Sequence, residues 1–401
     1  MSGLVLKNVN KIYPSGQQAV KDFNLEIENR EFLILTGPTG CGKSTLLRMI
    51  AGLEEISSGS LFIGGKDMTD SEPRDRNIAM VFKNSILYPE MSVLDNLSFA
   101  LRMGKMAQDE IDGRVKEAAG FLNLDSILEQ MPAELTKEET YRVLLGRALV
   151  RRPGILLLDS VIADLEEELQ VVLRQELLEI YQKMDMTVIY ATDNQGTAGT
   201  LATRMIVMED GMICQDDTYE NLVKNPVNRF VAGVVGRVPM NFFPATVIKQ
   251  ENQAGLKLKS GQILLPDEAG KALIDGAYPG KEVIAGIRAD GLHLVENASG
   301  NSNGILTVTF QGMAGGKAET ALKFLENETE GLCLASQAPD CGTGGRIKLS
   351  VDAGFTFLTV KPEKPSQIKM IKKGLIHFTV SVLFCEKIQN FSSLFCAFAL
   401  K

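Results

Sequence analysis

The chain has 401 residues, of which 45% are hydrophobic and 23% are charged, a composition typical of a globular protein with two domains. Its 42 basic and 50 acidic side chains give a net charge of −8, which opposes nonspecific attraction to nucleic acid or to an anionic lipid surface. We therefore expect no nucleic-acid partner, and we expect any membrane contact to run through a protein.

Cysteine usage and hydropathy indicate a cytoplasmic protein. The six cysteines are scattered without a C-x-x-C pair, and only two histidines are present to complete a metal site, a pattern typical of a reducing compartment. The first ten residues lack a basic region followed by an apolar run. No stretch reaches the roughly 20 apolar residues that a membrane-spanning helix needs.

Strands and helices are predicted to alternate in the first half of the chain. Residues 32–36 (FLILT) form an apolar run before the glycine-rich GPTGCGKST, and residues 43–53 then show helical spacing. Further buried strands are predicted at residues 155–159, 187–191 and 205–208. This alternation favours a mostly parallel sheet covered on both faces. Residues 95–152 are helix-prone and are expected to form an inserted helical subdomain.

The glycine-rich loop has the spacing of a phosphate-binding motif. Gly37, Gly42, Lys43 and Ser44 satisfy G-x-x-x-x-G-K-[ST], with a strand before the motif and a helix after it. Glycines let backbone N–H groups surround phosphates, and the lysine reaches the β- and γ-phosphates. The alternative, a glycine-rich turn with a chance lysine, does not explain the strand–loop–helix context. The residues predicted to bind the phosphates are Gly37, Pro38, Thr39, Gly40, Cys41, Gly42, Lys43, Ser44 and Thr45.

A magnesium site is predicted beside this loop. Ser44 supplies a hydroxyl, and Asp159 closes the apolar run 155–159 (ILLLD) at the position of a Walker-B carboxylate. A simple turn residue at the end of a strand is the alternative for Asp159. Because the phosphate-binding lysine is present elsewhere in the chain, we expect Ser44 and Asp159 to hold Mg²⁺.

The pattern of hydrophobic and polar residues changes after residue 237. Short alternating segments at residues 245–248, 283–287, 305–310 and 347–351 are separated by Gly, Asn and Asp, which favours a small β-barrel or sandwich. The last segment, about 377–401, is apolar and rich in Phe, Cys and Ser. Two readings stay open for it: an extra packed helix or strand, and a tail of changed reading frame or poor constraint.

Longer motifs carry a resemblance to the ATP-binding subunits of ABC transporters, in particular carbohydrate importers of the maltose/glycerol-phosphate type. The resemblance extends over about residues 3–360. The motifs are GPTGCGKSTLLRMIAGLEEISSG, RDRNIAMVFKNSILYPEMSVLDNLSFALRM, RVLLGRALVRRP, ILLLD and TVIYATDNQ…LATRMIVMEDG, followed by NRFVAGVVGRVPMNFFPATV and VIAGIRADGLHLVE.

The resemblance implies a fold and a domain plan. The fold is an α/β P-loop NTPase cassette with an inserted helical subdomain, followed by an all-β, OB-like barrel of the TOBE/MOP type. The corresponding boundaries are 1–235 for the cassette, with its helical subdomain at about 84–152, 236–365 for the regulatory barrel, and 366–401 for an atypical tail. Tyr13 stands where the family has an aromatic residue that stacks on adenine.

The resemblance also implies cofactors and partners. These are ATP with Mg²⁺, the transmembrane subunits of an importer, and a second cassette, identical or different, that completes each ATP site. An extracytoplasmic sugar-binding protein is an indirect partner. The subunit is expected at the inner face of the plasma membrane, bound through the transporter.

Three positions of the nucleotide site that this chain itself forms depart from the family pattern. Lys83 replaces the glutamine that senses Mg²⁺ and the membrane subunit, Ser160 replaces the catalytic glutamate, and Asp193 replaces the switch histidine that contacts the γ-phosphate. Serine has no carboxylate to polarise the attacking water, and loss of a positioned general base typically costs about 10²–10⁴-fold in rate. No catalytic residue is therefore intact, and Asp193 is expected to repel the γ-phosphate.

The signature segment departs as well. The family sequence L-S-G-G-Q acts in trans on the partner's nucleotide, and its place is taken here by Leu135, Thr136, Lys137, Glu138 and Glu139. The glutamates add negative charge where backbone N–H groups meet phosphate, which Lys137 offsets in part.

Three functions remain open from the sequence. The first is an importer subunit that binds ATP and docks to membrane subunits, with weak or absent hydrolysis. The second is a fully active importer ATPase with unusual catalytic residues. The third is a non-enzymatic pseudo-ATPase regulator or an eroded cassette.

Overall fold

The computed structural model describes residues 2–193, 202–236, 238, 240–250, 253–265, 267–275, 278–295, 304–315, 320–335, 338–339, 341–352, 356–360, 369–370 and 382–384. They divide into two units, Met1–Val223 and Lys224–Lys401. No helix in these ranges combines the length and apolarity that a membrane span requires.

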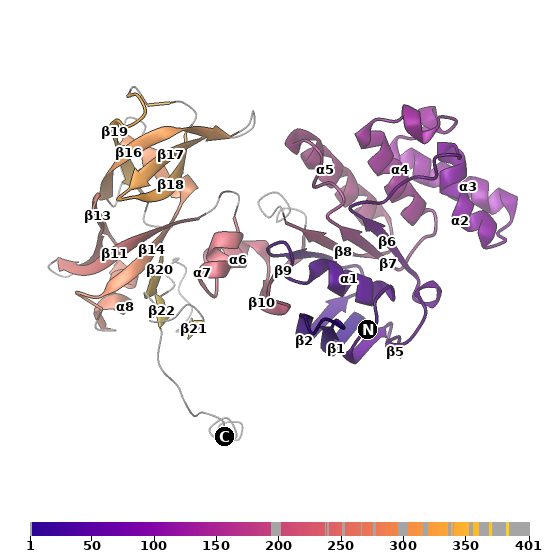
Figure 1. The fold of residues 1–401 in the computed structure, drawn as a ribbon, viewed down its shortest axis with the longest axis horizontal. Coiled ribbons are helices and arrows are strands. Elements are labelled where there is room, and N and C mark those ends of the chain that lie inside the picture. Colours follow the sequence, from indigo (N-terminus) through magenta and orange to yellow (C-terminus); the bar gives the residue numbers. More distant parts are fainter. Residues whose placement is uncertain are drawn as a thin grey trace, which may run out of the picture. The chain divides into compact units, whose positions relative to one another are not determined.

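A six-stranded sheet forms the centre of the first unit (Figure 1). Its strands are β3 (Phe32–Thr36), β6 (Ile78–Phe82), β7 (Ile155–Asp159), β8 (Thr187–Thr192), β9 (Arg204–Glu209) and β10 (Met212–Asp217), in the order β10-β9-β3-β8-β7-β6. All neighbours are parallel except β9 and β10. β3, β7 and β8 are buried at every residue, as expected for strands covered on both faces. The mostly parallel sheet and its predicted strands are thus confirmed.

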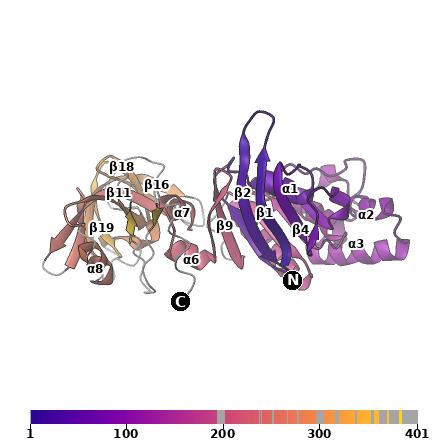
Figure 2. The same ribbon diagram turned by 90° about the horizontal axis from the view of Figure 1, so that it is seen from below.

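A second, antiparallel sheet precedes and follows the P-loop in sequence, and the sequence analysis did not predict it. Its strands are β1 (Ser2–Ile12), β2 (Gln18–Glu28), β4 (Ser58–Ile63) and β5 (Lys66–Asp67), in the order β2-β1-β4-β5. Figure 2 shows β2, β1 and β4 side by side. Alternate residues of β2 are buried, so one face packs inward. Leucines and isoleucines of β1 and β2 share one core with α1 (Lys43–Ala51), β3 and β7.

Three further helices occupy most of the stretch predicted to be helix-rich. They are α2 (Val93–Met103), α3 (Gln108–Leu122) and α4 (Lys137–Leu149), which pack on one another (Figure 1). The unit also contains α5 (Glu167–Lys183), α6 (Tyr219–Lys224), which ends at the boundary, and the short 3-10 turns Pro73–Asp75, Asp125–Ile127 and Pro132–Glu134. Ser92 caps α2 by accepting a hydrogen bond from the Asp95 amide.

Arg76 joins the end of α1 to the loop that follows β5. Its side chain is buried, with 4% of the residue exposed. Its guanidinium donates hydrogen bonds of 2.7–3.1 Å to four backbone carbonyls, those of Met49, Ile50, Thr69 and Ser71. Because the last carbonyls of a helix have no partner within the helix, the arginine acts as a C-terminal cap.

Replacing Arg76 by alanine is expected to lower the free energy of unfolding by about 2–4 kcal/mol, because buried carbonyls would lose charged donors. Chemical denaturation would measure this change. Arg74→Ala is the matched control, since Arg74 pairs with the exposed Glu72 and its side chain is 78% exposed. Equal losses in the two variants would show that Arg76 is not a structural cap.

The second unit is a nearly closed, barrel-like sheet. Its strands are β11 (Met240–Gln250), β12 (Gln253–Lys257), β13 (Gly261–Leu264), β14 (Glu282–Arg288), β15 (Leu292–Leu294), β16 (Gly304–Gly315), β17 (Thr320–Glu326), β18 (Thr329–Leu334), β19 (Arg346–Val351), β20 (Thr356–Val360), β21 (Lys369–Met370) and β22 (Val382–Phe384). Neighbours from β11 to β20 are antiparallel. The four strands predicted here are confirmed, and the inward side chains form one core.

Two helices accompany the barrel, α7 (Arg229–Val234) and α8 (Asp267–Asp275). The Arg229 guanidinium lies 4.7 Å from the ring centre of Phe242 on β11, and Arg288 of β14 donates to the Val235 carbonyl at 2.9 Å. These contacts place α7 with the barrel, whereas the boundary predicted after residue 235 assigns it to the cassette. Of the tail predicted at 366–401, only β21 and β22 are described. The two readings for the rest lie outside the described residues.

Candidate nucleotide site

The loop between β3 and α1 is shaped by its glycines. Gly37 and Gly42 have φ angles of 148° and 108°, in the region that favours glycine. A Cβ atom at Gly37 would lie 2.2 Å from the Met208 carbonyl oxygen, and one at Gly42 would lie 2.4 Å from that of Ala19. The loop therefore needs glycine at both positions, and the backbone turns around a space at the N-terminus of α1.

Lys43, the first residue of α1, points back into this loop. Its Nζ donates to the carbonyl oxygens of Gly37 at 2.8 Å and Pro38 at 3.0 Å. It also forms an ion pair of 2.6 Å with Oδ1 of Asp193, and only 6% of the lysine side chain is exposed. An ammonium group has three donors. All three are thus engaged.

Asp193 directly follows β8 and reaches the loop with both carboxylate oxygens. Oδ1 contacts Lys43, while Oδ2 accepts a hydrogen bond from Oγ1 of Thr39 at 3.1 Å. Its side chain is 49% exposed. The sequence analysis placed Asp193 opposite a γ-phosphate, but it did not find this direct contact with Lys43, the lysine predicted to bind phosphate.

Ser44 and Asp159 meet beside the loop. Oγ of Ser44 donates to Oδ1 of Asp159 at 2.9 Å, and Asp159 is the last residue of β7. A hydroxyl and a carboxylate are oxygen ligands of the kind that Mg²⁺ prefers. The donor set fits the predicted metal, although no cluster of three His, Cys, Asp or Glu ligands exists within the described ranges. Burial raises the pKa of the neighbouring Cys41 thiol, so this cysteine stays protonated.

Lys83 and Ser160 follow neighbouring strands. Phe82 pairs in register with Asp159, so the residues that follow the two strands emerge at the same edge of the sheet. Ser160 has a φ of 51°, and its amide donates to the Ala191 carbonyl at 2.9 Å. Lys83 forms a 3.1 Å ion pair with Asp164 in the loop after Ser160. The sequence analysis missed Asp164, because only the fold brings the two loops together.

Tyr13 lies beside the same helix. Its hydroxyl is 3.3 Å from Oγ1 of Thr45, and Nζ of Lys11 lies 5.2 Å from the ring centre. Lys11 is buried and pairs with Glu54 at 2.7 Å. The structure thus brings Tyr13 to the phosphate loop, as the adenine-stacking hypothesis requires. Lys11 belongs to no recognised motif, but its ammonium group lies beside the Tyr13 ring.

The signature segment forms the capped start of α4. Leu135 precedes the cap residue Thr136, whose Oγ1 accepts from the Glu139 amide at 3.2 Å, while a Glu139 carboxylate oxygen accepts from the Thr136 amide at 2.8 Å. This is a capping box. The backbone and side-chain hydrogen bonds from Thr136 lower the pKa of Glu139, which stays anionic at neutral pH.

Glu138 is also held within the chain. It pairs with Arg142 at 2.7 Å, and Arg142 binds both carboxylate oxygens of Glu176 on α5 at 2.6 and 3.1 Å. Both carboxylates are thus engaged by groups of their own helix, contacts that the sequence analysis did not predict. Lys137 is the first residue of α4.

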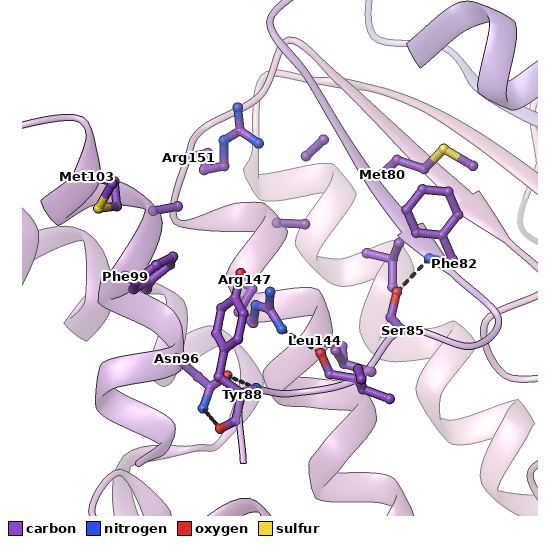
Figure 3. Close-up of a pocket in the computed structure, with 15 residues that line it drawn as sticks. Met80, Phe82, Ser85, Tyr88, Asn96, Phe99, Met103, Leu144, Arg147 and Arg151 are labelled. Atoms are coloured by element: carbon purple, nitrogen blue, oxygen red, sulfur yellow. Dashed lines mark hydrogen bonds between the residues drawn. The ribbon is translucent and has the colours of Figure 1, made fainter. Parts of the chain in front are cut away.

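A pocket of about 530 Å³ lies between β6 and helices α2 and α4. Figure 3 shows Tyr88, Phe99, Met103 and Arg147 around it. The Arg147 guanidinium lies 4.5 Å from the ring centre of Tyr88 and donates to the Ile86 carbonyl at 2.8 Å. Ile86 is 80% exposed. The pocket therefore combines apolar and aromatic side chains with polar groups and with two arginines, Arg147 and Arg151, and a hollow of this kind can receive an amphipathic segment.

Asn96 holds the Tyr88 edge of the pocket in place. Its Oδ1 accepts from the Tyr88 amide at 2.8 Å, and its Nδ2 donates to the Tyr88 carbonyl at 3.1 Å (Figure 3). The Tyr88 and Phe99 rings lie 4.9 Å apart. These contacts fix the exposed ring without covering it.

Comparison with known proteins identifies the family. The "ABC transporter" family model matches residues 20–163, and the "MalK OB fold domain" model matches residues 239–292. The oligosaccharides import ATP-binding protein MsmX of Bacillus subtilis is 43% identical over 293 residues, covering 73% of this chain and 79% of that protein. The trehalose import ATP-binding protein SugC of Mycobacterium tuberculosis is 43% identical over 291 residues, covering 72% of each.

A solved structure agrees with this assignment. The cbiO1 protein of Clostridium perfringens, part of the ABC transporter complex cbiONQ, superposes with a TM-score of 0.51 at 26% identity, covering 54% of this chain and 88% of that chain. The P-loop, the Ser44–Asp159 pair and the barrel that follows have the order that the resemblance implied. The chain therefore belongs to the ATP-binding subunits of ABC transporters and carries a MalK-type OB-fold domain.

Proposed function

We propose that this chain is the ATP-binding subunit of a carbohydrate importer and that its own ATP hydrolysis is weak or absent. One observation carries the proposal: the loop that binds phosphate is complete, whereas Ser160 and Asp193 stand where a general base and a γ-phosphate sensor are needed. The names of MsmX and SugC, which are import proteins for oligosaccharides and trehalose, support a carbohydrate as the transported solute.

Nucleotide binding uses groups that already converge. The N–H groups of residues 37–45 and the N-terminus of α1 attract the phosphates, and Lys43 supplies the cation. Tyr13 offers a ring to the adenine. Ser44 and Asp159 would hold Mg²⁺, which when bound neutralises charge on the β- and γ-phosphate oxygens. Lys83 contributes a second ammonium at this edge of the sheet.

Hydrolysis lacks the general base that the family places directly after the carboxylate corresponding to Asp159. Ser160 has a hydroxyl, which is a poor base near neutral pH, and a missing general base lowers the rate by about 10²–10⁴-fold. Asp193 accepts hydrogen bonds from Lys43 and Thr39 and cannot donate one to a γ-phosphate as the family's histidine does. Both replacements act on the chemical step and leave the phosphate cradle intact.

The pocket beside Tyr88 and Arg147 is the proposed docking surface for the membrane subunits. Tyr88 and Asn96, the two ends of the segment YPEMSVLDN that resembles the family's contact surface, line it. The subunit would thereby sit at the cytoplasmic face of the plasma membrane, paired with a second cassette of the same or another chain. The barrel assists dimerisation or regulation.

Measuring ATP binding and phosphate release on the same purified protein tests the proposal. We expect ATP to bind with micromolar to millimolar affinity while Mg²⁺-dependent phosphate release stays at or near background. Fast release would favour an active ATPase with unusual catalytic residues. Binding without release, together with failure to join membrane subunits, would favour a regulator, and absence of binding would favour an eroded cassette.

A further inference from the structure

The carboxylate of Asp193 pairs with the ammonium group of Lys43, which is the group that a nucleotide phosphate would contact. It lies 2.6 Å from Nζ of Lys43 and accepts a hydrogen bond from Thr39 at 3.1 Å. Both partners belong to the phosphate loop. An anionic group with two oxygens, one on the lysine and one on a loop hydroxyl, makes the contacts that a phosphate makes in such a loop.

Nothing else on Lys43 is free to bind a phosphate. The other two donors of its ammonium go to the carbonyls of Gly37 and Pro38 at 2.8 and 3.0 Å. A phosphate oxygen must therefore displace a contact, and the contact with Asp193 is the one that can move, because that side chain is 49% exposed. The carbonyls, by contrast, are fixed in the backbone of the loop.

The displaced carboxylate stays close to the site. Asp193 directly follows Thr192, which pairs in register with Thr36, the last residue of β3 before the loop. The backbone therefore holds the negative charge at the edge where the phosphates end. A terminal phosphate near this carboxylate is repelled, and ATP extends further and carries more negative charge there than ADP does.

We infer that Asp193 determines nucleotide specificity: it competes with phosphate for Lys43 and biases the loop toward nucleoside diphosphates over triphosphates. The inference rests on the proposed nucleotide binding and adds the selectivity of that same site. It gives the replacement of the switch histidine a consequence for binding, separate from its effect on hydrolysis.

Asp193→Asn tests this directly, because asparagine keeps the size and can still accept from Thr39, while it loses the charge and the oxygen that contacts Lys43. Dissociation constants for ATP and ADP, each with Mg²⁺, would be measured by titration calorimetry on the full chain. We expect ATP binding to tighten about five- to tenfold, somewhat above the value of an exposed ion pair because Lys43 is buried. ADP binding should tighten less, so that the ratio of the two constants shifts toward ATP.

Asp185→Asn is the matched control. Asp185 precedes the same strand, β8, at its opposite end and pairs with Arg30, so the variant also loses one charge and one ion pair. We expect it to leave both constants unchanged. Equal tightening in the two variants would assign the effect to net charge and overturn the inference.

Two other outcomes also overturn it. If Asp193→Asn leaves both constants unchanged although Lys43→Ala abolishes binding, the carboxylate does not compete, and the proposed nucleotide site still stands. If Asp193→Asn weakens the binding of Mg²⁺–ATP, the carboxylate helps to hold the metal. By contrast, normal binding in Lys43→Ala would contradict the proposed function itself.

Discussion

Lys43→Ala is expected to abolish ATP binding at concentrations where the unchanged protein is saturated. The substitution removes the only cation that the phosphate loop itself supplies, and each charged hydrogen bond contributes about 1.5–3 kcal/mol, or about 10- to 100-fold in affinity. It also leaves Asp193 without its ion pair, which adds an uncompensated negative charge beside the phosphates. Titration with a fluorescent ATP analogue would measure the loss.

Lys7→Ala serves as the control for this experiment. Lys7 lies on β1 with its Nζ 5.0 Å from the ring centre of Phe62, so the variant removes one positive charge from the same unit without touching the loop. Binding of the analogue should be unaffected. If Lys43→Ala and the unchanged protein bound the analogue equally, the assignment of residues 37–45 as a phosphate cradle would be wrong.

Restoring the signature segment is expected to produce the second large effect, in a mixed dimer with an intact cassette. In such a dimer the partner's nucleotide would face Thr136, Lys137, Glu138 and Glu139 of this chain. Their change to Ser, Gly, Gly and Gln removes two carboxylates and lets the backbone approach the phosphate. We expect ATP turnover at the partner's site to recover by about 10²-fold, comparable with the loss of a transition-state hydrogen-bond donor.

The companion variant is Ser160→Glu with Asp193→His, measured by phosphate release from the chain alone. It restores a base and a sensor but leaves the signature of the second copy altered, so only a modest gain is expected. If the fourfold variant formed mixed dimers but its ATP turnover did not change, the defect would lie in docking to the membrane subunits or in Lys83. A full recovery by the double variant alone would show that the signature segment is competent as it stands.

The sequence was sufficient for the parts of the fold whose signals are local. β3 and β7 were located to the residue because a short apolar run ends at a glycine or an acidic residue. The sheet of β1, β2, β4 and β5 was missed in part because β1 pairs with β4 across the phosphate loop and its helix, a separation that periodicity does not encode. The pairs β1–β2 and β4–β5 are local, and the alternation along β2 is a signal that the sequence analysis did not use.

The site shows the same division. Spacing alone predicted the loop, Ser44 and Asp159, and the structure brings Ser44 and Asp159 within hydrogen-bonding distance. The ion pairs Lys43–Asp193 and Lys83–Asp164 join the carboxyl edges of different strands, so they follow from the fold and not from any motif. The capping box at Thr136 and Glu139 has the sequence pattern T-x-x-E, so it too was predictable from local sequence.

The bidentate contact of Arg142 with Glu176 couples the motion of two parts of the cassette. It links α4, which belongs to the group of α2, α3 and α4, with α5, and the same guanidinium also holds Glu138. Any swivelling of the helical group relative to α5 must break a charged, forked pair whose side chains are only 15% and 22% exposed. Added salt screens such a pair weakly. A rotation of the helical group relative to α5 would therefore first require Arg142 to release Glu176.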